Sequence, residues 1–276
     1  MKRMFLLLTG ICVALTLTAQ TDTTGKSNQS DTIRIGGMII VNKKGKKGED
    51  GDKDVEVYRR RRDYKPSNVS TNWFIVDLGF ANWSDKTDYA AARTSGFIAP
   101  DITEDQLDLR SGKSVNVNIW IFMQKLNIIK HVVNLKYGFG VELNNYRFSE
   151  DIKFMKNPTL IMKDIVQHDK NKLAADYATI PLMLNFNFTP RREEGFGFSI
   201  GASGGYLYSA RQKVKGGQGK KAKEHDDFDL RKFKISYIGE LQLGPIKFYG
   251  SVANRSMWEK GLDMTPYNVG VRFSNW

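Results

Sequence analysis

The chain has 276 residues, a formal net charge of +12 at pH 7 and one cysteine, Cys12. Cys12 lies within a predicted secretion signal, so the exported chain would contain no cysteine. This excludes disulfides, thiol catalysis and cysteine-based metal sites. A basic chain often binds nucleic acid, but we expect no nucleic-acid partner because the chain is predicted to be exported.

The N-terminal residues 1–19 have the pattern of a cleavable signal peptide. Lys2 and Arg3 form its positive start, an apolar core follows, and small residues predict cleavage after Ala19. Residues 20–70 are polar and predict a flexible, mostly disordered periplasmic segment, although Asp31–Val41 could pair as a strand. No later apolar run is long enough for a spanning helix, so the chain would cross a membrane as strands.

The remainder of the chain alternates apolar and polar residues in segments separated by turn signals, which is typical of strands. Eight segments show this pattern: Trp73–Trp83, Lys113–Gln124, Val133–Asn144, Tyr177–Thr189, Phe196–Ala210, Phe233–Leu243, Ile246–Asn254 and Tyr267–Phe273. Their connections are alternately long and short, as in outer-membrane barrels. We therefore predict an all-β fold, an eight-stranded antiparallel up-and-down transmembrane β-barrel over residues 71–276.

Alternation alone leaves open which face points inward. A membrane barrel would expose the apolar face to lipid, whereas a soluble exported barrel of the lipocalin type would bury it. Charges of both signs at mid-strand favour the membrane barrel, because they can pair across a narrow lumen. The predicted lumen-facing polar residues are Asp77, Lys136, Glu142, Lys234, Glu240 and Arg272.

Several apolar positions follow from this choice of face. Met123 and the C-terminal Phe273 are assigned to the lipid-facing side. Aromatic residues near the strand ends predict girdles at the two membrane interfaces. These residues are Trp73, Trp83, Tyr177, Tyr249, Trp258, Tyr267 and Trp276.

Three stretches of the sequence resemble the PorT-like family of outer-membrane β-barrel proteins. They are "YATIPLMLNFNF", "GFGFSIGASGGYLYSARQK" and "DTIRIGGMIIV". The resemblance implies a bacterial outer-membrane location and, through the name-giving member, an association with a secretion machinery that exports proteases. It carries over no catalytic or binding residue, because the shared motifs describe strands.

No catalytic, cofactor or metal site is predicted. The stretch "EHDDFD", which contains His225, Asp226 and Asp227, is interpreted as a solvated loop. We expect a non-enzymatic outer-membrane barrel that serves as a membrane anchor, a surface-binding module or a secretion or assembly factor. The alternatives are a narrow pore and the soluble lipocalin-like barrel. Eight strands leave an interior that side chains fill, which disfavours a diffusion pore.

The connection Arg211–Lys223 is predicted to be a flexible basic loop at the outer surface. Its six cations are candidates for binding lipid phosphate groups: Arg211, Lys213, Lys215, Lys220, Lys221 and Lys223. The alternative is a solvated loop neutralised by the acidic residues that follow. The expected partners are therefore outer-membrane lipid and lipopolysaccharide, with envelope proteins meeting the N-terminal segment or the outer loops.

Overall fold

The computed structural model describes residues 31–35, 38–42, 56–59, 66–192, 195–216 and 221–274. The chain divides into two units, residues 1–63 and 64–276. The predicted signal peptide, most of the predicted periplasmic segment, Lys220 and Trp276 lie outside the described residues.

The first unit contains a three-stranded antiparallel sheet. Its strands are β1 (Asp31–Ile35), β2 (Met38–Asn42) and β3 (Glu56–Arg59), in that order. The stretch Asp31–Val41, which the sequence allows as one strand, thus contributes to two paired strands. Among the described residues, these three strands form a sheet of their own.

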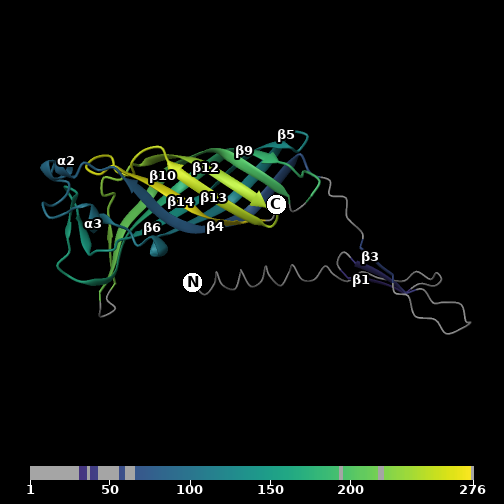
Figure 1. Cartoon of the computed structure of the whole chain (residues 1–276), viewed down its shortest axis with the longest axis horizontal. Coiled ribbons are helices and arrows are strands. Elements are labelled where there is room, and N and C mark those ends of the chain that lie inside the picture. The colour runs from purple at the N-terminus through teal and green to yellow at the C-terminus, as the bar shows by residue number, and fades with distance from the viewer. Residues whose placement is uncertain are drawn as a thin grey trace, which may run out of the picture. The chain divides into compact units, whose positions relative to one another are not determined.

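The second unit is a closed ring of antiparallel strands (Figure 1). The eight strands of the ring are β4 (Val69–Asp85), β5 (Val115–Ile129), β6 (Val133–Arg147), β9 (His168–Asn187), β10 (Phe196–Gly216), β12 (Phe233–Leu243), β13 (Ile246–Ala253) and β14 (Met264–Phe273). Neighbours in sequence pair with each other, and β14 pairs with β4 to close the ring. The predicted all-β antiparallel class is confirmed, although several strands are longer than the sequence indicates.

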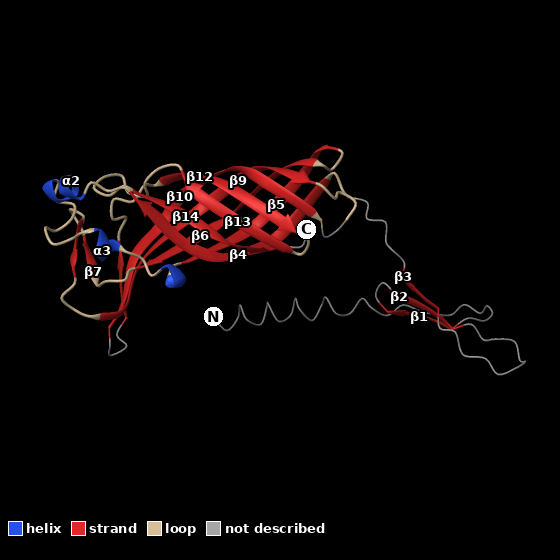
Figure 2. Ribbon diagram, viewed as in Figure 1, coloured by secondary structure: helices blue, strands red, loops and turns tan. Residues whose placement is uncertain are grey.

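The connections differ at the two ends of the ring. Short turns join β5 to β6, β9 to β10 and β12 to β13. The long connections contain folded elements: α2 (Tyr89–Thr94), α3 (Glu104–Leu107), the 3-10 helix η1 (Ser111–Lys113), β7 (Ile152–Met155), β8 (Leu160–Lys163) and β11 (Lys221–His225). Figure 2 shows α2, α3 and β7 together at one end. No helix within the described ranges is long and apolar enough to cross a membrane.

The outer surface of the ring is apolar and its interior is largely polar. On β6, Leu135 is partly exposed, whereas the next residue, Lys136, is 2 % exposed. The same alternation exposes Leu182 on β9 and Phe248 on β13. It buries Asn185, which lies on the inner face of β9. Phe273, at the end of β14, is also exposed. The predicted assignment of faces is therefore confirmed for these strands.

Two irregularities change the alternation within β4 and β5. Phe74 has a positive φ of 55°, and both Trp73 and Phe74 are exposed. The register of β5 against β6 shifts between Trp120 and Phe122. An extra residue in one strand reverses which side chains face inward beyond it. The prediction that Met123 faces lipid is therefore wrong, because Met123 is fully buried.

The predicted aromatic girdles are also largely wrong. Trp73 and Tyr267 are exposed, but four others are buried: Trp83, Tyr177, Tyr249 and Trp258. The ring of Trp83 lies 4.9 Å from Tyr146 and 5.6 Å from Trp258, measured between centroids. Trp83, Tyr177 and Trp258 belong to a buried apolar cluster that includes residues of the folded connections, whereas Tyr249 hydrogen-bonds Asn116 among the polar side chains. The prediction treated strand-end aromatics as surface residues and missed this buried cluster.

Candidate functional site

The interior of the ring holds an ion-pair network. Arg272 on β14 donates from Nε and Nη2 to the two carboxylate oxygens of Asp77 on β4, at 2.7 and 2.8 Å. Its Nη1 donates to Glu240 on β12. Glu240 also accepts from Lys136 Nζ on β6 at 2.6 Å. Because β6 and β12 are not neighbours in the ring, this chain of charges crosses the interior.

A second ion pair links the same two strands nearer the folded connections. Glu142 on β6 accepts from Lys234 Nζ on β12 at 2.5 Å. The same oxygen accepts from the side-chain amides of Asn144 and Asn268 at 3.0 and 3.2 Å. Buried charges are tolerated when they are paired and hydrogen-bonded in this way.

The structure brings all six predicted lumen-facing residues into these two groups of ion pairs. Five are less than 8 % exposed, and the Lys234 side chain is 9 % exposed. Two neutral donors on β5 also belong to this network: Trp120 Nε1 and Asn118 Nδ2 donate to Asp77 at 2.8 and 3.1 Å. The alternation places Asn118 on the polar face, but sequence reasoning missed Trp120. The repeated asparagines of "NVNIW" were a usable signal, since they alternate with apolar residues on one strand.

Tyr249 crosses the seam between the last and first strands of the ring. Gly79 on β4 pairs with Gly270 on β14. A Cβ on Gly79 would lie 2.5 Å from the Tyr249 hydroxyl oxygen, and one on Gly270 would lie 2.7 Å from the Tyr249 ring. The hydroxyl donates to Asn116 Oδ1 on β5 at 2.5 Å. The two glycines therefore leave the room that this phenol needs.

One end of the interior is closed by a buried apolar cluster, here called the apolar cap. It joins residues of the ring, such as Trp83 and Leu173, to residues of the long connections, such as Phe154 and Phe228. The rings of Phe154 and Phe228 are 5.4 Å apart. Gln212 on β10 fixes β7 by accepting from Phe154 N at 3.0 Å and donating to the carbonyl oxygen of Ile152 at 2.7 Å.

Little space remains among the polar side chains. A cavity lined by Asn118, Trp120, Glu142 and Arg272, among others, measures about 30 Å³. Such a volume holds on the order of two water molecules. The arrangement can hold the ring rigid, but it leaves no room there for a solute.

The connection predicted to be a basic loop instead forms strands. Its described residues continue β10 and form β11, and β10 pairs with β11 on one side and with the first residues of β9 on the other. Lys213 lies opposite Lys172 and Lys223, and Lys215 lies opposite Lys170 and Lys221. These six lysines are called the basic sheet. They point outward, because the alternate residues Asn171, Leu173 and Gln212 are buried. Like charges directly opposite each other destabilise a sheet.

Within the described ranges, one ion pair involves the basic sheet. Asp169 lies 3.9 Å from Lys215. Burial and the neighbouring Lys170 lower the pKa of Lys172, and burial and Arg211 lower the pKa of Lys213. Both shifts indicate that the charged form of these lysines is disfavoured in the free protein.

Four of the six predicted phosphate-binding cations belong to the basic sheet: Lys213, Lys215, Lys221 and Lys223. The other two, Arg211 and Lys220, do not. Arg211 is held by Asp176 at 2.5 Å and its side chain is 19 % exposed, so it is engaged elsewhere. Lys220 lies outside the described residues. Sequence reasoning missed Lys170 and Lys172, although the alternation "KNK" continues the pattern of β9 backwards.

The stretch Glu224–Asp229 begins within β11 and continues beyond its end. His225 and Asp227 are exposed. Within the part of the chain that the structure describes, no three His, Cys, Asp or Glu side chains gather as metal ligands.

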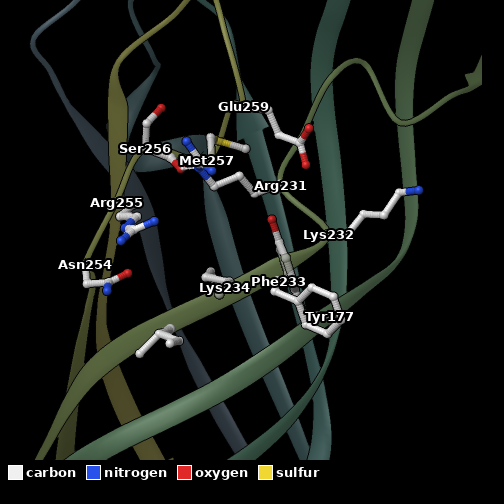
Figure 3. A pocket seen from close by; sticks show the side chains of 11 residues that line it. Tyr177, Arg231, Lys232, Phe233, Lys234, Asn254, Arg255, Ser256, Met257 and Glu259 are labelled. Atoms are coloured by element: carbon white, nitrogen blue, oxygen red, sulfur yellow. Dashed lines mark hydrogen bonds between the residues drawn. The ribbon is translucent and has the colours of Figure 1, made fainter.

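A pocket opens in the wall of the ring where β12 separates from residues 254–259 (Figure 3). Two backbone hydrogen bonds bound it: Asn254 N donates to Ile235 O at 2.9 Å, and Arg231 N donates to Met257 O at 2.8 Å. The cavity between them, here called the wall pocket, measures about 350 Å³. Most of its charged lining residues are basic: Arg231, Lys232, Lys234 and Arg255, with Glu259 as the acidic member.

The inner side of the wall pocket is formed by β9. Tyr177 is 2 % exposed, and Lys234 Nζ lies 4.2 Å from the centre of its ring. The outer rim is apolar, since Phe233 is 74 % exposed and Ile235 53 % exposed. The pocket thus lies where the apolar outer surface meets a group of cations.

A family model described as outer membrane protein beta-barrel domain matches residues 78–253. The match runs from within β4 to the end of β13 and includes the wall pocket residues up to Ile235. No curated protein matches the sequence.

Proposed function

Because the chain belongs to the outer membrane protein beta-barrel domain family, we propose that this outer-membrane protein is a closed barrel. It anchors a binding surface in the membrane and does not conduct solutes. The family is generally non-enzymatic, and the proposed role includes no catalytic step. The exposed apolar side chains of the ring contact lipid. The pairing of β14 with β4 closes the ring, so the spanning sheet has no open edge.

The filled interior is the observation that carries the proposal. The ion pairs from Asp77 through Arg272 and Glu240 to Lys136 cross the ring, and the apolar cap covers one end. An eight-stranded barrel has an interior just wide enough for side chains. A solute would have to break buried ion pairs to pass.

The orientation follows from the lengths of the connections. Outer-membrane barrels place short turns in the periplasm and long connections outside. The apolar cap and the basic sheet would then face the exterior. The protein presents folded structure there, since α2, α3 and the β7–β8 hairpin are packed against the ring.

A planar bilayer measurement tests the closed barrel. Purified protein should insert without stable large conductance steps. A many-stranded porin prepared in the same detergent serves as the control for insertion. Reproducible porin-sized steps from a homogeneous sample would refute the proposal.

The basic sheet supports lipid phosphate as a partner of the outer surface. Each basic residue near an anionic membrane surface contributes on the order of 1 kcal/mol, and salt weakens this within a Debye length. Bound phosphate groups would also offset the repulsion between opposed lysines.

The test replaces Lys213, Lys215, Lys221 and Lys223 by Gln and measures binding to phosphorylated and dephosphorylated lipid A over a range of salt. A control variant removes four exposed cations elsewhere: Lys113, Lys130, Lys156 and Arg191. Only the first variant should lose the preference for the phosphorylated form. If the wild type shows no such preference at low salt, the basic sheet is a solvated connection.

The narrower PorT-like assignment stays a prediction. It would make the protein part of a secretion or assembly machinery that engages envelope proteins through the N-terminal segment or the outer connections. Co-purification from native outer membranes tests it, and recovery of the protein alone after mild solubilisation would count against it.

A further inference from the structure

We infer that the wall pocket binds the phosphate group of a lipid in the outer leaflet. It is a site distinct from the basic sheet. The inference rests on the proposed orientation, which places the pocket at the outer boundary of the membrane. Below it, Ile235 and Tyr237 expose apolar side chains; above it, Arg231 and Lys232 precede the strand. A headgroup at this level and acyl chains along β12 would match the two chemistries.

The charges of the wall pocket favour an anion. Lys234 forms an ion pair with Glu142 at 2.5 Å, so its charge is already neutralised and is not counted toward the ligand. Arg231, Lys232 and Arg255 remain against Glu259, which leaves an excess of two positive charges. Arginine suits phosphate because its planar guanidinium presents several donors in a fixed geometry.

Arg231 is held in place for such a contact. Its Nε donates to the carbonyl oxygen of Ser256 at 3.1 Å. Its two terminal nitrogens have no hydrogen-bond partner within the described ranges and remain available to a ligand. The backbone of Arg231 is also fixed, through its bond to Met257 O.

Tyr177 provides a second, independent indication of a ligand. The residue is 2 % exposed, yet no group in the described part of the chain hydrogen-bonds its hydroxyl. The hydroxyl can therefore donate a hydrogen bond to a ligand in the pocket. Figure 3 shows this hydroxyl directed toward Arg231, from the inner side of the pocket. A phosphate oxygen placed between Tyr177 and Arg231 would accept from both.

The size and rim of the pocket favour a lipid over free phosphate. A cavity of about 350 Å³ is in the size range of small-ligand sites and larger than one inorganic phosphate requires. Phe233 and Ile235 expose apolar surface directly beside the cations. Free phosphate would leave that surface unused, whereas an acyl chain would cover it.

The experiment compares two double variants in detergent micelles that contain lipid A. The test variant combines Arg255→Gln with Tyr177→Phe, and the control combines Arg191→Gln with Tyr267→Phe. Arg191 is exposed in the β9–β10 turn, and Tyr267 is exposed on β14, outside the pocket lining. The test variant should bind phosphorylated lipid A roughly tenfold more weakly than the wild type, since it loses one cation and one hydrogen bond. The control should bind within about twofold of the wild type.

Two further readouts decide the outcome. Dephosphorylated lipid A should bind the wild type and the test variant equally. Excess inorganic phosphate should displace little lipid; complete displacement would assign the pocket to a soluble anion and overturn the inference. If the double variant does not fold, Arg255→Gln alone, at an exposed residue, should weaken binding about fivefold.

A test variant that binds phosphorylated lipid A as tightly as the control also overturns the inference. Its failure is distinguishable from failure of the closed barrel. A protein that conducts but keeps the effect of Arg255 and Tyr177 refutes only the closed barrel. A non-conducting protein without that effect refutes only the lipid site.

Discussion

Arg272 and Asp77 face each other at the seam where the last strand of the ring pairs with the first. They are register partners in the β14–β4 pairing and are joined by two hydrogen bonds of 2.7 and 2.8 Å. Arg272 extends the contact to Glu240, which holds Lys136. Arg272 and Asp77 therefore both stabilise the pairing that closes the ring and fill part of its interior.

Arg272→Met should lower the free energy of unfolding by roughly 3–5 kcal/mol, because it leaves the buried Asp77 without its main partner and weakens the pairing of Glu240. Arg191→Met, at an exposed turn residue, is the matched control and should change little. Urea titrations of protein refolded in lipid vesicles measure both. A loss below about 1 kcal/mol for Arg272→Met would show that the network is dispensable.

Leu182→Arg should destabilise the protein in lipid vesicles by roughly 2–4 kcal/mol, because the side chain lies on the apolar outer face of β9. Val166→Arg introduces the same charge at an exposed residue of an outer connection and should be nearly neutral. The comparison uses refolding titrations in the same vesicles. Equal effects at the two positions would contradict the assignment of lipid to the outer face.

Phe154→Ala should loosen the apolar cap without opening the ring. Phe154 is fully buried, and truncating a buried phenylalanine costs roughly 3–5 kcal/mol. Limited proteolysis should then cut the β7–β8 hairpin faster while the strands of the ring stay protected. Met155→Ala, at the exposed neighbour, should leave the cleavage rate unchanged. Simultaneous loss of protection in the ring would mean that cap and ring unfold together.

Lys213→Gln should stabilise the protein at neutral pH by roughly 0.2–1 kcal/mol, because it relieves repulsion from Lys172 and Lys223. Burial and Arg211 lower the pKa of Lys213. The folded state thus binds fewer protons than the unfolded state below the ordinary lysine pKa, so stability contributed by this group rises with pH. The variant should lose that rise.

Unfolding titrations of wild type and Lys213→Gln between about pH 7 and pH 10 measure the difference. Lys130→Gln, at an exposed turn residue, should keep the pH dependence of the wild type. A destabilising effect of Lys213→Gln would show that the basic sheet is not under repulsion in the free protein.

The alternation of side chains made much of the ring predictable from the sequence. Leu135 and Lys136 show why: a strand sends neighbours to opposite faces, and mid-strand charges on one face are tolerated only inside. The reasoning failed at Met123, because one extra residue in β5 reverses the phase and leaves little trace in composition. The order and length of strands were thus easier to predict than their local irregularities.

The apolar cap and the wall pocket were beyond reach of the sequence for another reason. A tryptophan near a strand end has the same sequence pattern whether it faces lipid or packs inside the apolar cap. The burial of Trp83 and Trp258 follows from their contact with each other, across 175 positions of the sequence. The wall pocket arises where β12 and residues 254–259 part, which is a property of the pairing. The basic sheet was partly visible as lysine runs, but the opposition of Lys213 to Lys172 depends on register.

The glycine pair beneath Tyr249 has a consequence for the fidelity of assembly. A slip of one residue between β14 and β4 would turn every side chain of β14 to the other face. Arg272 would then meet lipid, and a bulkier residue would replace Gly270 or Gly79 under the phenol. Shape and charge thus disfavour the same misalignment. A ring closed one residue out of register would therefore be less stable than the ring closed in its native register.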